Sequence, residues 1–315
     1  MLAAIKKPLD PEARAAMVRS LAHWWHGGEP PARQSGPTGP RKGAIEPDPE
    51  TPPRVQALEK IWGRGRYMPG TLEIDAELIA LLGLAEDARI GALGVSPQTL
   101  RAAPKAMIEV YEWRRELAGR TAAKLTGIAS VYHTDLDRPR WTGEQFDGLI
   151  SSEALSFADH KPGTSAAAFR ALPPGGRWVM VEYCGEVAPP PAAFASAFSE
   201  PQIVSRDQIV DILEEIGFII EAEEDVSAPL VEAAGEGFHR LAELMTKLAQ
   251  ADAEEAADRA IMLRELAWEA ETWKARRSAL RSGRLSTMHF IARKPGENEE
   301  RAAMPASSQT AAASA

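Results

Sequence analysis

Two carboxylates follow apolar, strand-forming runs and could accept hydrogen bonds from a ligand. Glu112 ends the run 107–112, and Asp135 comes shortly after the run 128–133. An ionised carboxylate only accepts hydrogen bonds, so Glu112 suits the two hydroxyl groups of a ribose and Asp135 suits the amino group of an adenine. The alternative interpretations are a solvated glutamate at a strand end and an aspartate that caps its own loop.

Three further side chains could move a proton or position a substrate, namely His160, Tyr183 and Glu153. An imidazole such as that of His160 titrates near neutral pH. Each residue also has a structural interpretation: a solvated loop histidine, an aromatic ring packed on later helices, and the first residue of a helix.

Metal and thiol chemistry are not expected. His23 and His26 lie three residues apart, but no further ligand stands near them in the sequence. The single cysteine, Cys184, can form no internal disulfide and has no evident activating partner, so it is interpreted as a small apolar filler.

The elements that must position these residues alternate between strand-like and helix-like runs. Six strand-like runs occupy residues 88–93, 107–112, 128–133, 146–151, 177–183 and 218–223. Such alternation predicts an α/β three-layer sandwich with a mostly parallel sheet, and ligands bind beyond the carboxyl ends of its strands. The residues expected along this edge are Gly91, Gly94, Glu112, Trp113, Asp135, Leu136, Ser151, Glu153 and Tyr183.

The alternation stops after residue 223. Residues 230–283 form a helical stretch in which Leu266, Trp273 and Leu280 repeat every seven residues, and the run 287–293 follows as a seventh strand. This pattern predicts a pair of long helices inserted before the last strand, which could cover the ligand-binding edge or form a homodimer. The basic residues Arg276, Arg277, Arg281 and Arg284 are interpreted as a solvated face rather than a nucleic-acid site.

The ends of the chain differ in composition from its middle. Residues 1–28 predict one helix, and residues 29–53 are so rich in proline that an extended linker is expected. Residues 54–295 form the predicted α/β domain, and the Ala- and Ser-rich tail 296–315 is predicted to be disordered.

Overall composition excludes several protein classes. The 315 residues are 44% hydrophobic and 26% charged, as in globular proteins, and the net charge is −9. This acidic balance argues against binding to nucleic acid or to an anionic membrane. The sequence has no apolar run long enough to span a bilayer and no secretory signal, so a soluble cytoplasmic protein is expected.

Several segments, in their order and spacing, resemble the class I S-adenosylmethionine-dependent methyltransferases that act on small molecules, of the methyltransferase type 11 kind. These segments are 61–70, 112–117, 146–155, 172–183 and 288–295, and the Leu-Pro-Pro-Gly-Gly turn at 172–176 is the most specific of them. Together they span about three quarters of the chain, from Ile61 to Pro295.

The resemblance implies a Rossmann-like sheet, S-adenosyl-L-methionine as cofactor and a small molecule as methyl acceptor. It places the cofactor on Gly91, Gly94, Glu112, Trp113, Asp135, Leu136 and Ser151, with His160, Tyr183 and Glu153 near the acceptor. Because the sulfonium of the cofactor is already a strong electrophile, the protein mainly aligns the acceptor and excludes water.

The first glycine motif departs from the family pattern of acid-x-Gly-x-Gly-x-Gly. Aligned on Gly91, the chain has Arg89 in place of the acid and Leu93 and Val95 in place of two glycines. Such side chains would intrude on the cofactor. The sequence therefore leaves three hypotheses: a methyltransferase, a non-catalytic relative that serves as a binding or scaffold module, and another nucleotide-using α/β protein.

Overall fold

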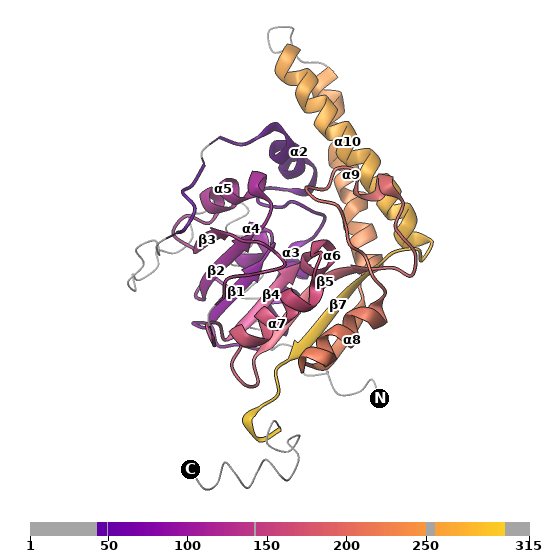
Figure 1. Ribbon diagram of the computed structural model, residues 1–315. Coiled ribbons are helices and arrows are strands. Elements are labelled where there is room, and N and C mark those ends of the chain that lie inside the picture. Colours follow the sequence, from indigo (N-terminus) through magenta and orange to yellow (C-terminus); the bar gives the residue numbers. More distant parts are fainter. Residues whose placement is uncertain (1–42, 49, 142, 250–255, 300–315) are drawn as a thin grey trace, which may run out of the picture.

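The computed structural model of the chain describes residues 43–48, 50–141, 143–249 and 256–299 (Figure 1). The predicted N-terminal helix, most of the predicted linker and the tail beyond residue 299 lie outside the described residues.

A seven-stranded sheet forms the centre of the molecule, in the order β3-β2-β1-β4-β5-β7-β6. Neighbouring strands from β1 to β5 pair in parallel, whereas β7 pairs antiparallel with both β5 and β6. The strands are β1 (Arg89–Leu93), β2 (Met107–Glu112), β3 (Ala129–His133), β4 (Gly148–Ser152), β5 (Arg177–Cys184), β6 (Ile219–Asp225) and β7 (Ser286–Arg293). The predicted, mostly parallel sheet is therefore confirmed.

Helices cover both faces of this sheet, as the alternating sequence predicts (Figure 1). Successive side chains of a strand point to opposite faces, so Ile90 and Ala92 join one hydrophobic cluster while Leu93 joins the other. The first cluster includes residues of α3 (Leu72–Leu81), α4 (Pro97–Leu100) and α5 (Arg115–Lys124). The second includes residues of α6 (Ala154–Phe157), α7 (Lys161–Ala171) and α8 (Arg206–Ile216).

The boundaries of α8 are encoded locally. Ser205 and Gln208 form a reciprocal capping box, in which the side chain of each residue accepts a hydrogen bond from the backbone N–H of the other. Gly217 ends the helix in a left-handed conformation with φ 109°. The next residues continue directly into β6 at the edge of the sheet.

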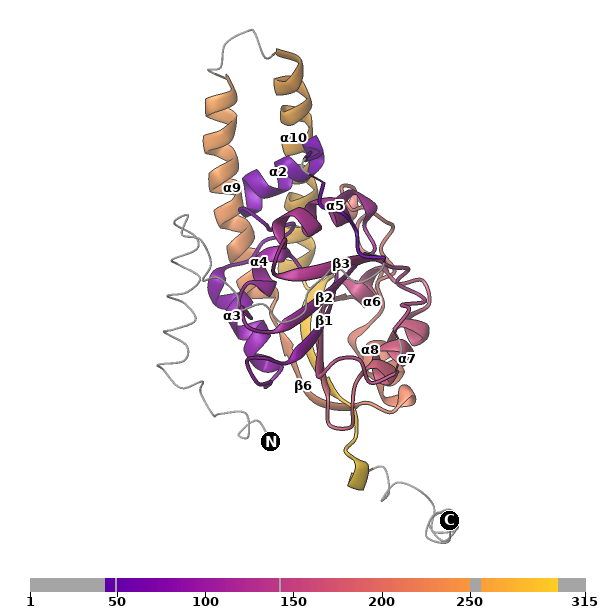
Figure 2. The same ribbon diagram turned by 90° about the vertical axis from the view of Figure 1, so that its left-hand side faces the viewer.

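The predicted pair of long helices comprises α9 (Ser227–Ala249) and α10 (Ala256–Arg281). Figures 1 and 2 show the pair projecting beyond the carboxyl edge of the parallel strands. Helix α2 (Pro53–Trp62) and the 3-10 turn η1 (Pro191–Phe194) pack against it. No helix in the described ranges combines the length and apolar content needed to cross a bilayer.

Two of these helices are absent from the predictions made from sequence. Helix α2 begins at Pro53, inside the predicted linker, because proline fits the first turn of a helix as well as it fits an extended chain. Helix α3 is capped by Thr71, whose side chain accepts a hydrogen bond from Ile74 N–H at 3.3 Å.

Candidate functional site

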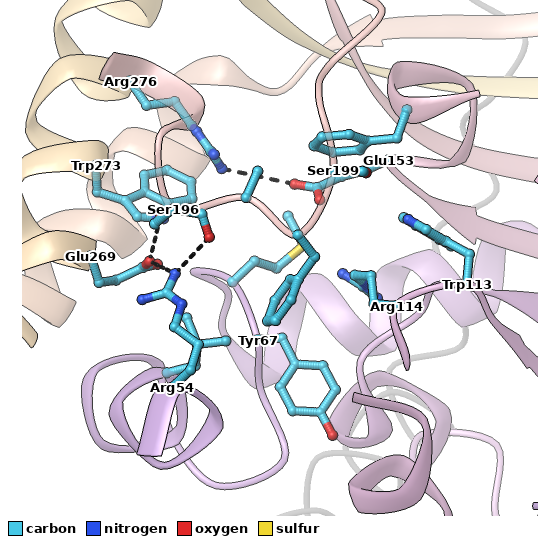
Figure 3. Close-up of a pocket in the computed structure, with 15 residues that line it drawn as sticks. Arg54, Tyr67, Trp113, Arg114, Glu153, Ser196, Ser199, Glu269, Trp273 and Arg276 are labelled. Atoms are coloured by element: carbon cyan, nitrogen blue, oxygen red, sulfur yellow. Dashed lines mark hydrogen bonds and ion pairs between the residues drawn. The ribbon is translucent and has the colours of Figure 1, made fainter. Parts of the chain in front are cut away.

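Chain order reverses between β1 and β4, and the carboxyl edge near this point is the expected ligand site. A cavity of about 40 Å³ lies there, enclosed by α2, α10, the end of β2, the start of α6 and the loop 196–199 (Figure 3). Such a volume holds a few water molecules, whereas ligand pockets usually measure roughly 300 Å³ or more.

Glu112 lies at this edge, at the end of β2, and its side chain is fully buried. Arg114 holds both carboxylate oxygens: Nε lies 2.7 Å from Oε1, and Nη2 lies 2.9 Å from Oε2. The backbone N–H of Arg114 donates a third hydrogen bond to Oε1 at 3.0 Å. Burial alone would lower the pKa of Arg114, but the Glu112 carboxylate outweighs it and raises that pKa. The two side chains therefore satisfy each other's hydrogen-bonding groups without a ligand.

Trp113 closes the neighbouring space above the turn that leaves β1. Gly94 has φ +66° in this turn, and a Cβ atom added to it would collide with the Trp113 ring. Arg114 Nη2 also donates to Gly94 O at 2.7 Å, and its guanidinium carbon lies 4.4 Å from the centroid of the Trp113 ring. The indole Nε1 of Trp113 is buried without a hydrogen-bond partner.

The structure corrects the alignment of the first glycine motif. Arg89 begins β1 at the opposite edge of the sheet, where its Nη2 lies 3.1 Å from Asp147 Oδ1. Leu93 and Val95 are buried in the hydrophobic clusters. The expectation that these three side chains intrude on the cofactor is therefore wrong, because Trp113 and Arg114 fill that space.

The other predicted cofactor residues have structural partners. Gly91 lies in the middle of β1, where an added Cβ would collide with Phe146 and Leu149. Ser151 Oγ accepts a hydrogen bond from Trp178 Nε1 at 3.0 Å. Asp135 is exposed and caps its own loop through Asp137 N–H at 3.0 Å, while the next residue, Leu136, is buried.

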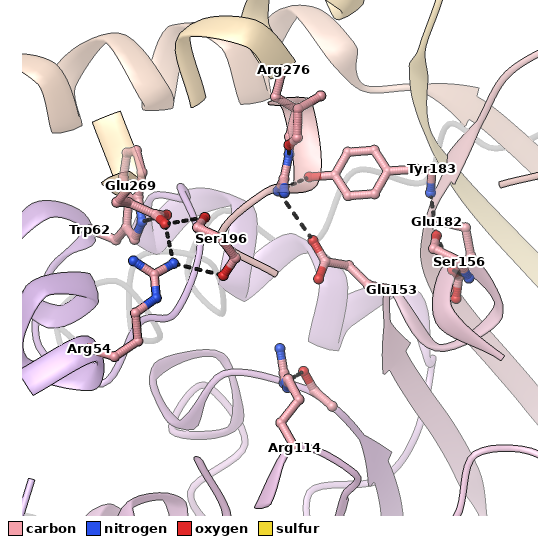
Figure 4. A network of polar contacts seen from close by, with 12 residues as sticks. Arg54, Trp62, Arg114, Glu153, Ser156, Glu182, Tyr183, Ser196, Glu269 and Arg276 are labelled. Carbon is pink, nitrogen blue, oxygen red and sulfur yellow. Dashed lines mark hydrogen bonds and ion pairs between the residues drawn. The ribbon is translucent and has the colours of Figure 1, made fainter. Parts of the chain in front are cut away.

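Of the three predicted acceptor-side residues, Glu153 and Tyr183 are brought together, by Arg276 of α10 (Figure 4). Arg276 Nη1 lies 3.3 Å from the Tyr183 hydroxyl and 4.0 Å from Glu153 Oε1. Burial raises the pKa of Tyr183 more than Arg276 lowers it, so the phenol is protonated at neutral pH. The prediction of a solvated face is wrong for Arg276, which is only 6% exposed.

The backbone of Glu153 supports a functional role for this residue. At φ 59° it is the one non-glycine residue with positive φ in the described part of the chain. Such a conformation costs free energy in a residue with a Cβ and occurs often at functional sites. His160, in contrast, caps α7: its Nδ1 accepts a hydrogen bond from Gly163 N–H at 3.1 Å, and it does not line the cavity.

Sequence reasoning missed a second polar cluster on the far wall of the cavity. Glu269 of α10 forms an ion pair with Arg54 of α2 and accepts hydrogen bonds at 2.8 Å from Trp62 Nε1 and from Ser196 Oγ (Figure 4). More than two hundred residues separate Arg54 from Glu269, so no local signal identifies the pair. The partner of Glu112 was detectable, because Arg114 stands only two residues away.

Glu182, next to Tyr183 on β5, is a further carboxylate that the sequence did not single out. It is fully buried and accepts hydrogen bonds from Leu155 N–H at 3.1 Å, Ser156 N–H at 2.8 Å and Ser156 Oγ at 2.7 Å. Burial nevertheless raises its pKa to about 7. Cys184 is also buried, and burial raises the pKa of its thiol to about 12, as suits an inert filler.

The described residues contain no group of three or more His, Cys, Asp or Glu side chains that could hold a metal ion. No protein-family model and no curated protein sequence matches the chain.

Solved structures of S-adenosylmethionine-dependent methyltransferases do match. Phosphoethanolamine N-methyltransferase 2 of Haemonchus contortus, bound to phosphomonomethylethanolamine and S-adenosylhomocysteine, aligns with TM-score 0.62 and 18% identity over 76% of this chain and 57% of that one. The chain therefore has the same fold as these methyltransferases. It spans just over half the length of the Haemonchus enzyme.

Two shorter proteins match over their whole length. The cyclopropane synthase MmaA2 of Mycobacterium tuberculosis aligns with TM-score 0.59 and 15% identity, and covers 78% of this chain and 100% of that one. The cyclase SpnF aligns with TM-score 0.58 and 16% identity, over 81% and 100% of the two chains. At this identity the matches establish architecture, and function has to be argued from the site.

Two of the matching structures hold S-adenosylmethionine or S-adenosylhomocysteine, and the site residues of this chain can be tested against that cofactor. The cofactor would need the oxygens of Glu112 and the space above Gly94. Arg114 already donates hydrogen bonds to both oxygens, and the Trp113 ring already occupies that space. The remaining cavity of about 40 Å³ is too small for it. The residues in this closed arrangement do not fit the cofactor.

Proposed function

We propose that the protein is an S-adenosylmethionine-dependent methyltransferase of a small molecule, and that it works in an open form in which Trp113 and Arg114 have left the crevice. One observation carries the proposal: a buried glutamate ends β2 beside the β1 turn, on the same sheet edge as a polar cavity. A carboxylate in that place can receive the two hydroxyl groups of a ribose once Arg114 withdraws.

Glu153, Tyr183 and Arg276 would form the acceptor side of such an enzyme. The Glu153 carboxylate lines the cavity and can accept a hydrogen bond or a proton from an acceptor that arrives protonated. The Tyr183 hydroxyl, which contacts Arg276 and does not line the cavity, would position the Arg276 and Glu153 side chains. Arg276, held at the wall through Nε and Ala193 O at 2.8 Å, would keep Tyr183 and Glu153 aligned.

We also propose that the substrate is a small molecule rather than a nucleic acid and that the protein acts in the cytoplasm, consistent with the net charge of −9. A homodimer through α9 and α10 is supported by three large apolar residues exposed on these helices, Met245, Ile261 and Trp268. Sedimentation of the wild type and of Trp268→Glu tests it: the variant is expected to be monomeric, and a wild-type monomer would contradict the dimer.

A non-catalytic binding or scaffold module is the second candidate. The closed crevice favours it, because Glu112 and Arg114 satisfy each other without a ligand. Calorimetric titration of the full chain with S-adenosylmethionine and S-adenosylhomocysteine separates the two. Micromolar binding supports the enzyme, whereas no heat at millimolar ligand, with the protein folded, supports the module.

A further inference from the structure

We propose that Trp113 and Arg114 form an internal plug, in which the Arg114 guanidinium occupies the place of a ligand diol on Glu112 and thereby competes with the cofactor. The inference rests on the proposed function, since it concerns how that same site is kept closed. The plug is defined as the side chains of these two consecutive residues at the end of β2.

The contacts of Arg114 make the competition direct. Its Nε and Nη2 atoms present two N–H donors to the two oxygens of Glu112, at 2.7 and 2.9 Å. A vicinal diol would present two O–H donors to the same two oxygens. Glu112 has no exposed surface, so the guanidinium and a diol cannot hold the carboxylate together.

Trp113 closes the space that the rest of a nucleoside would need. Its ring lies so close above Gly94 that an added Cβ would collide with it. Arg114 stacks on the same ring at 4.4 Å, so the two side chains support each other in the closed position (Figure 3). The buried indole N–H without a partner is a cost of this position, and it is relieved when the ring moves out.

Glu112 and Arg114 would each have a partner in the open form as well. Glu112 would exchange the guanidinium for ligand hydroxyl groups, so it would not be left unpaired. Arg114 faces Glu153 across the cavity (Figure 4), and the other cation beside Glu153, Arg276 Nη1, lies 4.0 Å from its Oε1. Glu153 is thus available to receive the released guanidinium.

A plug of this kind lowers the apparent affinity of the site without changing its contacts with the ligand. The apparent dissociation constant equals the intrinsic dissociation constant divided by the open fraction, because only open molecules bind. Removing the plug is therefore expected to strengthen binding, which is the opposite of the usual effect of deleting a site residue.

The test is calorimetric titration of S-adenosylhomocysteine into the wild type, Trp113→Ala and Arg114→Ala, all as full chains. Binding by both plug variants is expected to be about tenfold tighter or more, as removal of a mostly closed state requires. The exposed neighbour Arg115 supplies a matched control, Arg115→Ala, which should bind like the wild type.

Thermal melting of each variant verifies folding. Arg114→Ala leaves Glu112 without its cation, so if this variant fails to fold, Trp113→Ala, which keeps the ion pair, decides the matter. Equal affinity in the wild type and Trp113→Ala would overturn the plug and leave the proposed function standing. Absence of binding in every folded variant would overturn both.

Discussion

Two carboxylates at the carboxyl edge of the sheet, Glu112 behind Arg114 and Glu153 on the cavity wall, differ in how completely they are paired. Glu112 has three hydrogen bonds from one arginine, all within 3.0 Å. Glu153 has a cation at 4.0 Å and a strained backbone with φ 59°. A fully satisfied buried ion pair is costly to break and therefore resists a ligand, whereas a loosely paired carboxylate can still accept one. Access to Glu112 is therefore closed by its ion pair with Arg114, whereas access to Glu153 is limited by the small size of the cavity.

The largest expected effect on stability comes from breaking the ion pair between Glu112 and Arg114. Glu112→Ala leaves Arg114 buried without its counter-ion, so the free energy of unfolding should fall by about 3–5 kcal/mol. Chemical denaturation measures this change, with Glu116→Ala, an exposed glutamate of the next helix, as the control. A loss no larger than that of the control would show that the pair is not formed in solution.

A second prediction concerns how stability depends on pH through Glu182, the residue next to Tyr183 on β5. Burial raises the pKa of Glu182 in the folded protein to about 7, from about 4.5 in the unfolded chain. Between these values the folded protein binds more protons than the unfolded chain, so this group's contribution to stability is full below about pH 4.5 and is lost as the pH rises through about 7. The loss is on the order of 1–3 kcal/mol.

Glu182→Gln should remove this dependence. Denaturation at pH 5 and at pH 8 is measured for the wild type and the variant, and the stability of the variant relative to the wild type should increase with pH. Taking the difference between the two proteins cancels the opposite contribution of His289, whose pKa burial lowers to about 4. A difference that does not change with pH would contradict the raised pKa.

Removing the Tyr183 hydroxyl should have a smaller effect on stability. Tyr183→Phe removes one hydrogen bond to Arg276, at 3.3 Å, and should cost about 0.5–1.5 kcal/mol of stability. The aromatic contact of residue 183 with Phe194 is retained. If the variant is as stable as the wild type by chemical denaturation, the hydrogen bond from Arg276 to the hydroxyl does not stabilise the fold.

The smallest expected effect on stability comes from relieving the backbone strain at Glu153. Asparagine tolerates positive φ better than glutamine does, so Glu153→Asn should be more stable than Glu153→Gln by about 0.5–1 kcal/mol. Both variants lose the charge that faces Arg276, so the comparison isolates the backbone. The reverse order of melting temperatures would indicate that the turn relaxes in solution.

Local patterns predicted the architecture well. The run 107–112 matches β2 residue for residue, because strand formation there follows from the pattern of neighbouring residues in the sequence. The helical pair was predicted from its periodicity, and of its two suggested roles the structure shows α10 covering the cavity. Dimerisation remains a prediction.

The site was harder to predict, since it depends on contacts between distant segments. Arg276 looked like one of several surface arginines and is buried only because Phe194 and Trp273 flank its guanidinium. The alignment of the first glycine motif was wrong for a different reason. One glycine, Gly91, lies inside β1 and another, Gly94, lies in the turn that follows, and the family pattern alone does not show which of them begins the motif.

The connection between α10 and β7 has a consequence for how any molecule reaches the cavity. Helix α10 runs through the turn at Gly283 into β7, which is hydrogen-bonded to a strand on each side. The helical pair is thus attached to the sheet at both ends, with β6 before α9 and β7 after α10, so any movement of the pair relative to the sheet must be absorbed by the short connections on either side of it. Because the cavity measures only about 40 Å³, its lining side chains must also rearrange before a larger molecule can enter.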